Sequence, residues 1–365
     1  MQYGVIMAGG AGTRLWPLSR ADLPKQLLPV VHGKSLLQLS YERLRGMLPP
    51  QQIYVCTAAA HRDAVLKNLP ELPKENLLGE PMGRDTTNAV GFPAAILSRK
   101  DKDAVFAVTT ADHVIEPIDV FQTAVKTAFD VTTKTPATLV TFGIIPTHGH
   151  TGLGYIHRGE AIAGVQGAYK VQAFKEKPDK ATADRYVESG RYYWNSGMFV
   201  WRADTVLKEI AAHLPDSHKG LMQIADAWGT PKQDAVLNET YPKLPKISVD
   251  YAIMEPASLG KGYAQVVVVE LPIKWLDVGS WPALAETLGV DESGNAVSAA
   301  NFVYLDSEDN IVVCDDPKHL ISLIGVNDMV VVHTRDATMI CPKSESQRVK
   351  ELVGKVKEKF NNKFQ

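Results

Sequence analysis

A glycine-rich loop near the N-terminus is followed by two cations. The run Ala8-Gly9-Gly10-Ala11-Gly12-Thr13-Arg14 comes after residues 3–7, a short apolar stretch that predicts a buried strand. Its three glycines remove the Cβ atoms that would keep a polyanion away from the backbone, and successive N–H groups can form an anion-binding concavity. Arg14 and Lys25 supply full positive charges. The spacing predicts phosphate binding, and the alternative is an ordinary glycine-rich turn.

Two familiar phosphate-binding motifs do not fit this loop. A dinucleotide fingerprint that starts at Gly10 would need glycine or alanine at position 15, where the chain has Leu15. A P-loop that ends in Gly33-Lys34-Ser35 would need glycine at position 28, where the chain has Leu28. The loop therefore belongs to neither class.

An aspartate follows the apolar run of residues 104–108. Asp112 lies just past this predicted strand, where strand ends of an open α/β sheet converge on the ligand crevice. A carboxylate in that place is suited to a metal ion or a hydroxyl group. We therefore predict that Asp112 is a metal ligand, and the alternative is a helix N-cap. The neighbouring His113 is interpreted as structural.

Three histidines, His148, His150 and His157, surround a second glycine-rich turn. A zinc site is the alternative to a simple turn here. Because no cysteine or compact set of carboxylates completes the ligands, the turn is favoured.

Short apolar runs alternate with helical patterns through the first three quarters of the chain, which predicts an α/β fold with a mainly parallel sheet. From residue 294 short strands broken by turns indicate a small all-β unit. A terminal helix is expected to begin at Ser344, with Gln347 three residues later as a capping-box partner. We place the boundary between a large domain, residues 1–290, and a smaller one, residues 291–365.

Composition narrows the class of protein. A chain of 365 residues with a formal net charge of −2 has no global attraction for nucleic acid or for an anionic membrane. Its three cysteines, Cys56, Cys314 and Cys341, are widely spaced and odd in number, which argues against a disulfide framework. No apolar run approaches the roughly 18 residues of a membrane span, and no leader pattern is present. A cytoplasmic protein is expected.

The long form of the first loop resembles a known signature. Gly-Gly-x-Gly-Thr-Arg-Leu, a short spacer and Pro-Lys are found in nucleotidyltransferases that activate sugar 1-phosphates. The extension Trp16-Pro17-Leu18-Ser19-Arg20, with Pro24-Lys25-Gln26 after it, is similar to that of the mannose-1-phosphate guanylyltransferases. The resemblance covers nearly the whole chain and rests on at least six motifs in the family order.

The resemblance assigns a nucleotide site and a sugar site. The segment Glu80-Pro81-Met82-Gly83-Arg84 corresponds to a loop beside the base, and the chain departs from the family pattern just after it, at Asp85, Thr87 and Asn88. The nucleotide-binding residues implied are Gly9, Gly10, Gly12, Thr13, Arg14, Lys25, Glu80, Pro81 and Arg84. The sugar-binding residues implied are Gly154, Glu176, Lys177, Asn195 and Asp250.

The same resemblance implies a cofactor and a fold. Asp277, in a Trp-x-Asp-Val-Gly-Ser-Trp segment, is expected to join Asp112 at one Mg²⁺ ion. The large domain is expected to be a Rossmann-like mixed sheet, and the small one a left-handed β-helix-like domain with a terminal helix. No phosphomannose isomerase module of the kind found in some long relatives is expected after it.

The expected reaction converts GTP and α-D-mannose 1-phosphate to GDP-mannose and pyrophosphate. In the family scheme Arg14, Lys25 and Lys177 are the catalytic cations. The alternatives are another nucleotide, another sugar 1-phosphate, or a regulator that binds sugar nucleotide without turnover. Because the edges of the short strands must be covered, the C-terminal domain is also expected to form a homodimer.

Overall fold

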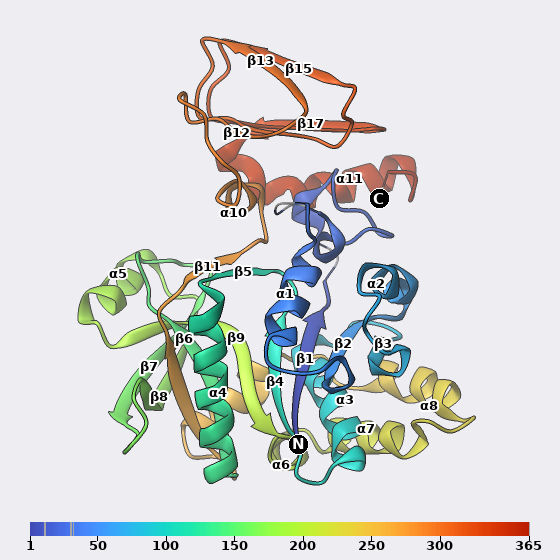
Figure 1. Cartoon of the computed structure of the whole chain (residues 1–365), viewed down its shortest axis with the longest axis vertical. Helices are drawn as coiled ribbons and strands as arrows, with labels where there is room; N and C mark the ends of the chain where they lie inside the picture. The colour runs from blue at the N-terminus through green and yellow to red at the C-terminus, as the bar shows by residue number, and fades with distance from the viewer. Residues whose placement is uncertain (11, 30, 32, 365) are drawn as a thin grey trace. The chain divides into compact units, whose positions relative to one another are not determined.

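The computed structural model describes residues 1–10, 12–29, 31 and 33–364, so Ala11 of the glycine-rich loop lies outside the described residues. The chain divides into two compact units (Figure 1). Unit 1 consists of residues 1–9, 40–110 and 115–275, and unit 2 consists of residues 10–39, 111–114 and 276–365. Ala8 and Gly9 of the glycine-rich loop therefore belong to unit 1, whereas the part of the loop from Gly10 onward belongs to the same unit as the C-terminal segment. A sequence boundary near residue 290 stays a prediction.

Unit 1 is built on one nine-stranded sheet with the order β3-β2-β1-β4-β9-β6-β10-β8-β7. Strands β1, β2, β3 and β4 pair in parallel, as do β6 and β10, whereas β7, β8 and β9 pair antiparallel to their neighbours. This mixed sheet confirms the α/β fold and the mixed sheet that the resemblance implies, but the prediction of a mainly parallel sheet is wrong, because β7, β8 and β9 pair antiparallel. The strands are β1 (Gln2–Ala8), β2 (Ile53–Ala58), β3 (Leu77–Glu80), β4 (Val105–Thr110), β6 (Thr138–Ile144), β7 (Gly154–Ala161), β8 (Ala168–Glu176), β9 (Tyr192–Arg202) and β10 (Gln265–Leu271).

Helices cover both faces of this sheet. Val266 and Val268 of β10 enter one apolar cluster with α3, α6 and α7, whereas Val267 and Val269 enter a second cluster with α4. Successive residues of a strand point to opposite faces, so the two clusters lie on the two sides of the sheet. The helices are α2 (Arg62–Asn68), α3 (Asp85–Lys100), α4 (Ile118–Lys134), α5 (Lys180–Ser189), α6 (Ala203–His213), α7 (Pro215–Ala227), α8 (Gln233–Thr240), the π-helix η7 (Asp250–Met254) and α9 (Glu255–Ser258).

Three elements contain residues that are assigned to both units. They are α1 (Leu36–Arg45), β5 (His113–Glu116) and β11 (Lys274–Asp277), and the last two pair with each other. None of the helices formed by the described residues combines the length and apolar character that a bilayer crossing requires.

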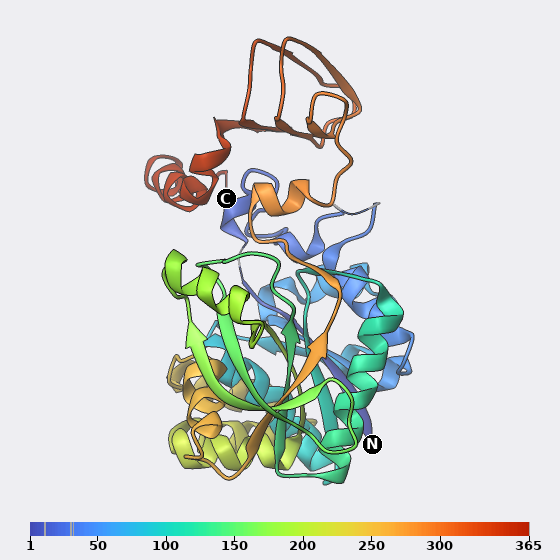
Figure 2. The same cartoon turned by 90° about the vertical axis from the view of Figure 1, so that its left-hand side faces the viewer.

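Unit 2 contains short strands that repeat along the C-terminal segment (Figure 2). β12, β14 and β16 pair in parallel, β17 closes their sheet antiparallel, and β13 and β15 form a parallel pair of their own. This succession of parallel rungs is the arrangement expected of a β-helix-like domain. The strands are β12 (Ala296–Ser298), β13 (Asn301–Leu305), β14 (Ile311–Cys314), β15 (Leu320–Ile324), β16 (Met329–Thr334) and β17 (Ala337–Pro342).

In unit 2, residues from the N-terminal part of the sequence pack against residues from the C-terminal part. One buried apolar cluster combines Leu15 and Trp16 of the signature loop with Trp281, Val349 and Val353. The helices are η1 (Thr13–Leu15), η2 (Lys25–Leu27), α10 (Trp281–Ala285), η8 (Lys343–Arg348) and α11 (Val349–Phe360). The α-helix thus begins later than the predicted Ser344, after the 3₁₀ helix η8. Burial of Trp16 against this C-terminal segment explains why the loop and the β-domain form one unit.

Candidate active site

Lys25 and Asp112 form a close ion pair in unit 2. The Lys25 Nζ lies 2.7 Å from Oδ2 of Asp112 and donates a second hydrogen bond to the carbonyl oxygen of Val278 at 3.2 Å. The two side chains are 10% and 23% exposed. Burial raises the pKa of Asp112, but the charge and hydrogen bond of Lys25 outweigh it and hold the pKa below the usual range. The ammonium group is therefore fixed in place.

The glycines of the loop make room for this lysine. Gly10 and Gly12 have φ angles of +93° and +60°, a region that side-chain-bearing residues rarely adopt. A Cβ atom on Gly12 would lie only 2.7 Å from the Cβ of Lys25. The Gln26 side chain donates to the carbonyl of Gly10 at 3.2 Å, and the Ser19 hydroxyl donates to that of Gly12 at 2.7 Å. The backbone of the predicted phosphate loop is thus held from both sides.

Arg14 lies beside the segment that carries Asp277. A Cβ atom built on Gly279 would be 3.0 Å from Nη2 of Arg14, so glycine at this position leaves space for the guanidinium group. Nη1 of Arg14 donates to Oε1 of Gln347 at 3.0 Å. Gln347 therefore holds the signature arginine. It does not serve as the predicted capping residue, and η8 has no side-chain cap at Pro342.

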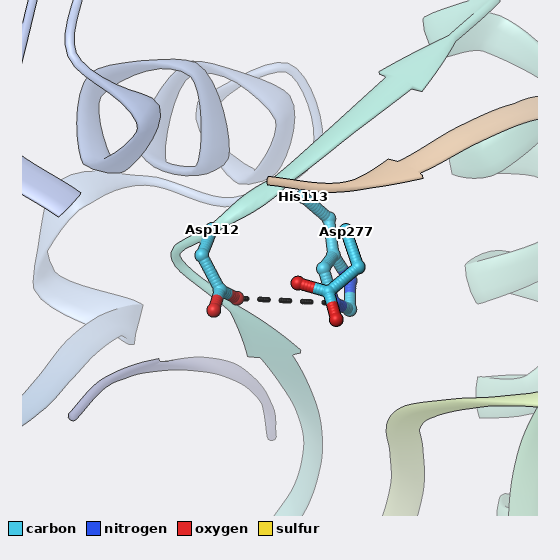
Figure 3. Close-up of side chains that lie close together, drawn as sticks. All are labelled: Asp112, His113 and Asp277. Carbon is cyan, nitrogen blue, oxygen red and sulfur yellow. Dashed lines mark ion pairs between the residues drawn. The ribbon is translucent and has the colours of Figure 1, made fainter. Parts of the chain in front are cut away.

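Asp112, His113 and Asp277 come together from distant parts of the sequence (Figure 3). Their potential ligand atoms all lie within 4.8 Å of one another, and this is the one such group found in the described part of the chain. His113 is buried, and its Nε2 lies 3.8 Å from Oδ1 of Asp112, whereas Asp277 is exposed. Two carboxylates at this separation fit a hard divalent cation such as Mg²⁺.

Residues predicted to bind the sugar lie together in unit 1. Nζ of Lys177 is 3.0 Å from Oε1 of Glu176, and Asn195 Nδ2 donates to Oδ1 of Asp250 at 2.8 Å. Gly154 pairs with Glu176 in the β7–β8 ladder, and a Cβ there would approach Oε2 of Glu176 to 2.6 Å. The glycine therefore leaves the carboxylate room. Asp250 begins a π-helix, a distortion often found at functional sites.

This group holds more negative than positive charge. Burial raises the pKa of Asp250, and the neighbouring charges of Glu176 and Asp85 raise it further, whereas the hydrogen bond from Asn195 lowers it. The hydrogen bond and charge of Glu176 raise the pKa of Lys177, which keeps the lysine protonated. Carboxylates that accept from hydroxyl groups beside one ammonium group suit a polyol that carries a phosphate.

Glu80 ends strand β3 in unit 1 and has a buried side chain. The hydroxyl of Tyr241 donates to Oε1 of Glu80 at 2.6 Å. Burial raises the pKa of Glu80, and hydrogen bonds from Tyr241 and Cys56 oppose that shift. Because its carboxyl group is bound inside the unit, the predicted contact with a base falls to the backbone of this segment and not to the Glu80 carboxylate.

Comparisons with known proteins identify the family. Residues 3–293 match a family model described as nucleotidyl transferase, and residues 300–356 match one described as MannoseP isomerase/GMP-like beta-helix domain. A mannose-1-phosphate guanylyltransferase of Klebsiella pneumoniae is 38% identical over 368 residues, which cover 100% of this chain and 76% of the relative. One of Escherichia coli (strain K12) is 39% identical over 367 residues, 97% of this chain and 73% of the relative. The chain belongs to the mannose-1-phosphate guanylyltransferase family.

A solved structure agrees with this assignment. A crystal structure from Thermus thermophilus, named as a mannose-1-phosphate geranyltransferase, has a TM-score of 0.84 and 32% sequence identity, and it covers 98% of this chain and 99% of its own. The two expected domains, a nucleotidyltransferase domain and a β-helix-like domain, are thereby confirmed.

Two of the departures from the guanylyltransferase pattern after Arg84, at Asp85 and Asn88, have structural roles. Asp85 adopts a φ of +64°, a conformation that Asn and Asp tolerate better than other side chains. The buried Asn88 side chain donates to the carbonyl of Arg84 at 3.1 Å and to that of Pro245 at 2.6 Å. The backbone N–H of Thr87 donates to the carbonyl of Ile247 at 3.3 Å. The loop is therefore held against residues 245–249.

The histidines near the second glycine-rich turn lie among aromatic rings. His157 stacks on Tyr192 with centroids 4.5 Å apart, and His148 lies edge-on to Trp194 at 5.1 Å. Sequence reasoning did not find Tyr241, the contact of Gln347 with Arg14, or the partners of Trp16 and Arg20. Each of them acts across a long sequence separation, so no local pattern marks it.

Proposed function

We propose that this chain transfers GMP from GTP to α-D-mannose 1-phosphate and forms GDP-mannose and pyrophosphate. Relatives at 38–39% identity carry the name of this activity. The observation that supports catalysis over mere binding is Lys25, a positively charged side chain that is fixed by Asp112 and lies beside Gly12 of the glycine-rich loop. A regulator without turnover would not need to keep these charged residues together.

The mechanism consists of alignment and charge neutralisation. An oxygen of the sugar phosphate attacks the α-phosphorus in line, and its existing negative charge makes a general base unnecessary. Arg14 and the loop amides hold the β- and γ-phosphates, and Lys25 stabilises charge on the transferring and leaving groups. Lys177 orients the attacking phosphate. Asp112 and Asp277 would hold a Mg²⁺ ion, which when bound supplies further neutralisation of phosphate charge.

Competition among the four nucleoside triphosphates tests the base. Guanine presents N1–H and N2 amine donors, and a carbonyl of the Glu80 segment would pair with them but would face an acceptor of adenine. An unpaired buried group costs about 1 to 3 kcal/mol, so GTP should lead ATP by roughly one to two decades. The measurement is pyrophosphate release with mannose 1-phosphate. A ranking led by UTP or dTTP would reject the guanylyl assignment and keep the transferase, whereas no release with any sugar phosphate would reject the enzyme.

Lys177→Ala should raise the KM for mannose 1-phosphate about tenfold or more and leave the KM for GTP within about twofold. The reason is that its ammonium group is assigned to the phosphate of the sugar, where a hydrogen bond to a charged group contributes about 1.5 to 3 kcal/mol. Lys170→Ala is the matched control, because Lys170 is also an exposed lysine of the β8 segment, paired with Glu160. Equal changes in both KM values would contradict the assignment.

A homodimer formed through the C-terminal domain is the expected assembly. Val303, Leu305, Leu320 and Ile324 are 52%, 61%, 57% and 73% exposed and belong to the paired strands β13 and β15. In the register of these strands exposed positions lie beside exposed positions, so the four apolar side chains share one exposed face with Asn301 and Ser322. Sedimentation at micromolar concentration should give twice the 39.9 kDa of one chain. A fully active monomer would contradict this prediction.

A cytoplasmic location, without nucleic-acid or membrane partners, stays a prediction from composition.

A further inference from the structure

The extension Trp16–Arg20, which distinguishes this family's signature, has no part in the mechanism above. Its two large side chains instead bind the end of the chain. Nε1 of Trp16 donates to the carbonyl oxygen of Phe364 at 2.7 Å, and Nη1 of Arg20 donates to the same oxygen at 2.6 Å. One backbone carbonyl near the C-terminus thus accepts from both signature residues.

Arg20 also reaches the last strands of the β-domain. Its Nη2 lies 2.5 Å from Oδ1 of Asp336 and 3.1 Å from Oγ1 of Thr334. The Arg20 side chain is only 14% exposed, and its guanidinium group lies 5.7 Å from the centroid of the Trp16 ring. A planar guanidinium that binds three acceptors at once fixes its own position more firmly than a lysine would.

These contacts continue into the phosphate-binding loop. Ser19, between the two signature residues, donates its hydroxyl hydrogen to the carbonyl of Gly12, and the backbone of Gly12 lies against Lys25. Two residues after Gly12, the side chain of Arg14 donates to the side chain of Gln347 in η8. The C-terminal segment therefore reaches the loop at Arg14 and at Trp16–Arg20, on both sides of Leu15.

We propose that the C-terminal segment positions the phosphate-binding loop. Trp16 and Arg20 are its docking residues on the loop, and the Phe364 carbonyl, Asp336 and Gln347 are their partners. All five are positioning residues, because none is assigned to substrate. The inference rests on the proposed function only in taking the loop as the site of nucleotide phosphates, and nucleotide binding can be measured without turnover.

Deletion of residues 361–365 tests the shared carbonyl. The deletion should weaken equilibrium binding of GTP, measured without sugar phosphate, by about tenfold, since the hydrogen bonds of Trp16 and Arg20 to the Phe364 carbonyl are both lost. Phe364→Ala keeps the backbone carbonyl and is the matched control, with an expected affinity within about twofold of the full chain. The KM for mannose 1-phosphate should stay unchanged in both, because its predicted residues lie in unit 1.

Side-chain variants test the same idea if the deleted chain does not fold. Gln347→Leu should weaken GTP binding severalfold, and Gln347→Glu, which retains an acceptor for Arg14, should restore it. Arg20→Lys should weaken GTP binding as well, because an ammonium group cannot reproduce the three contacts of the fork.

The outcomes separate the two proposals. A full chain that binds no nucleotide would reject the proposed function. A full chain that binds GTP, with a deletion variant and an Arg20→Lys variant that bind it equally well, would overturn the positioning role. A uniform loss of affinity for both substrates together with a lowered Tm would overturn it too, since it would show only a contribution to stability.

Discussion

Lys25→Ala should lower kcat by about 100-fold or more, because a preorganised charge directed at the transition state contributes a few kcal/mol. The lysine is already in place before substrate arrives. Its Nζ is bound by Asp112 and by the carbonyl of Val278, and its stem packs against Gly12. Little reorganisation is needed for the ammonium group to turn toward phosphate. Initial rates of pyrophosphate release at saturating substrates would measure the effect.

The control for this prediction is a lysine of the same unit without a catalytic assignment. Lys34→Ala removes an equal charge from the exposed part of the same segment and should change kcat by less than about twofold. Loss of Lys25 also removes the charge that lowers the pKa of Asp112, so the variant should need a higher pH for its residual activity. A fall in kcat of only a few-fold would remove Lys25 from the catalytic residues.

Local patterns predicted the α/β architecture of unit 1. The apolar run at residues 104–108 overlaps β4, because a strand buried on both faces leaves a continuous apolar signal. The pairing of Asp112 with Asp277 was predicted from motifs, and the structure brings both side chains within ligand distance. The buried strand and the two aspartate motifs could be predicted because each is recorded in the residue types of one short segment.

Contacts between segments that are distant in the sequence could not be predicted from local sequence patterns. Gln347 fits a capping box by spacing alone, yet its side chain accepts from Arg14, whose position in space no local pattern records. The resemblance places the Glu80 segment beside the base, and no local pattern shows that the Glu80 carboxylate accepts a hydrogen bond from Tyr241. The assignment of residues 10–39 to the same unit as the C-terminal segment depends on the burial of Trp16 against Val349 and Val353.

The ion pair between Lys25 and Asp112 also stabilises the folded chain, and this stabilisation depends on pH. The pKa of Asp112 is lower in the folded protein than its usual value, so the folded state favours the ionised carboxylate. This contribution to the free energy of unfolding is present above the usual Asp range and is lost as the pH falls through the lowered pKa. Asp112→Asn therefore changes both the proposed metal site and the pairing of Lys25, and it is the less selective of the two aspartate variants.

Asp277→Asn should abolish most turnover without unfolding the protein. Its side chain is exposed, and loss of one carboxylate charge there removes a hard oxygen ligand while the amide keeps the size of the group. Turnover should fall by about 100-fold at low magnesium and recover in part at high magnesium, because the weakened site can still fill. Asp22→Asn, an exposed aspartate of the same unit, should behave as the full chain does. The measurement is a magnesium titration of pyrophosphate release, paired with thermal melting. A variant that keeps the full chain's magnesium dependence and rate would exclude Asp277 from the metal site and leave Asp112 as its remaining carboxylate.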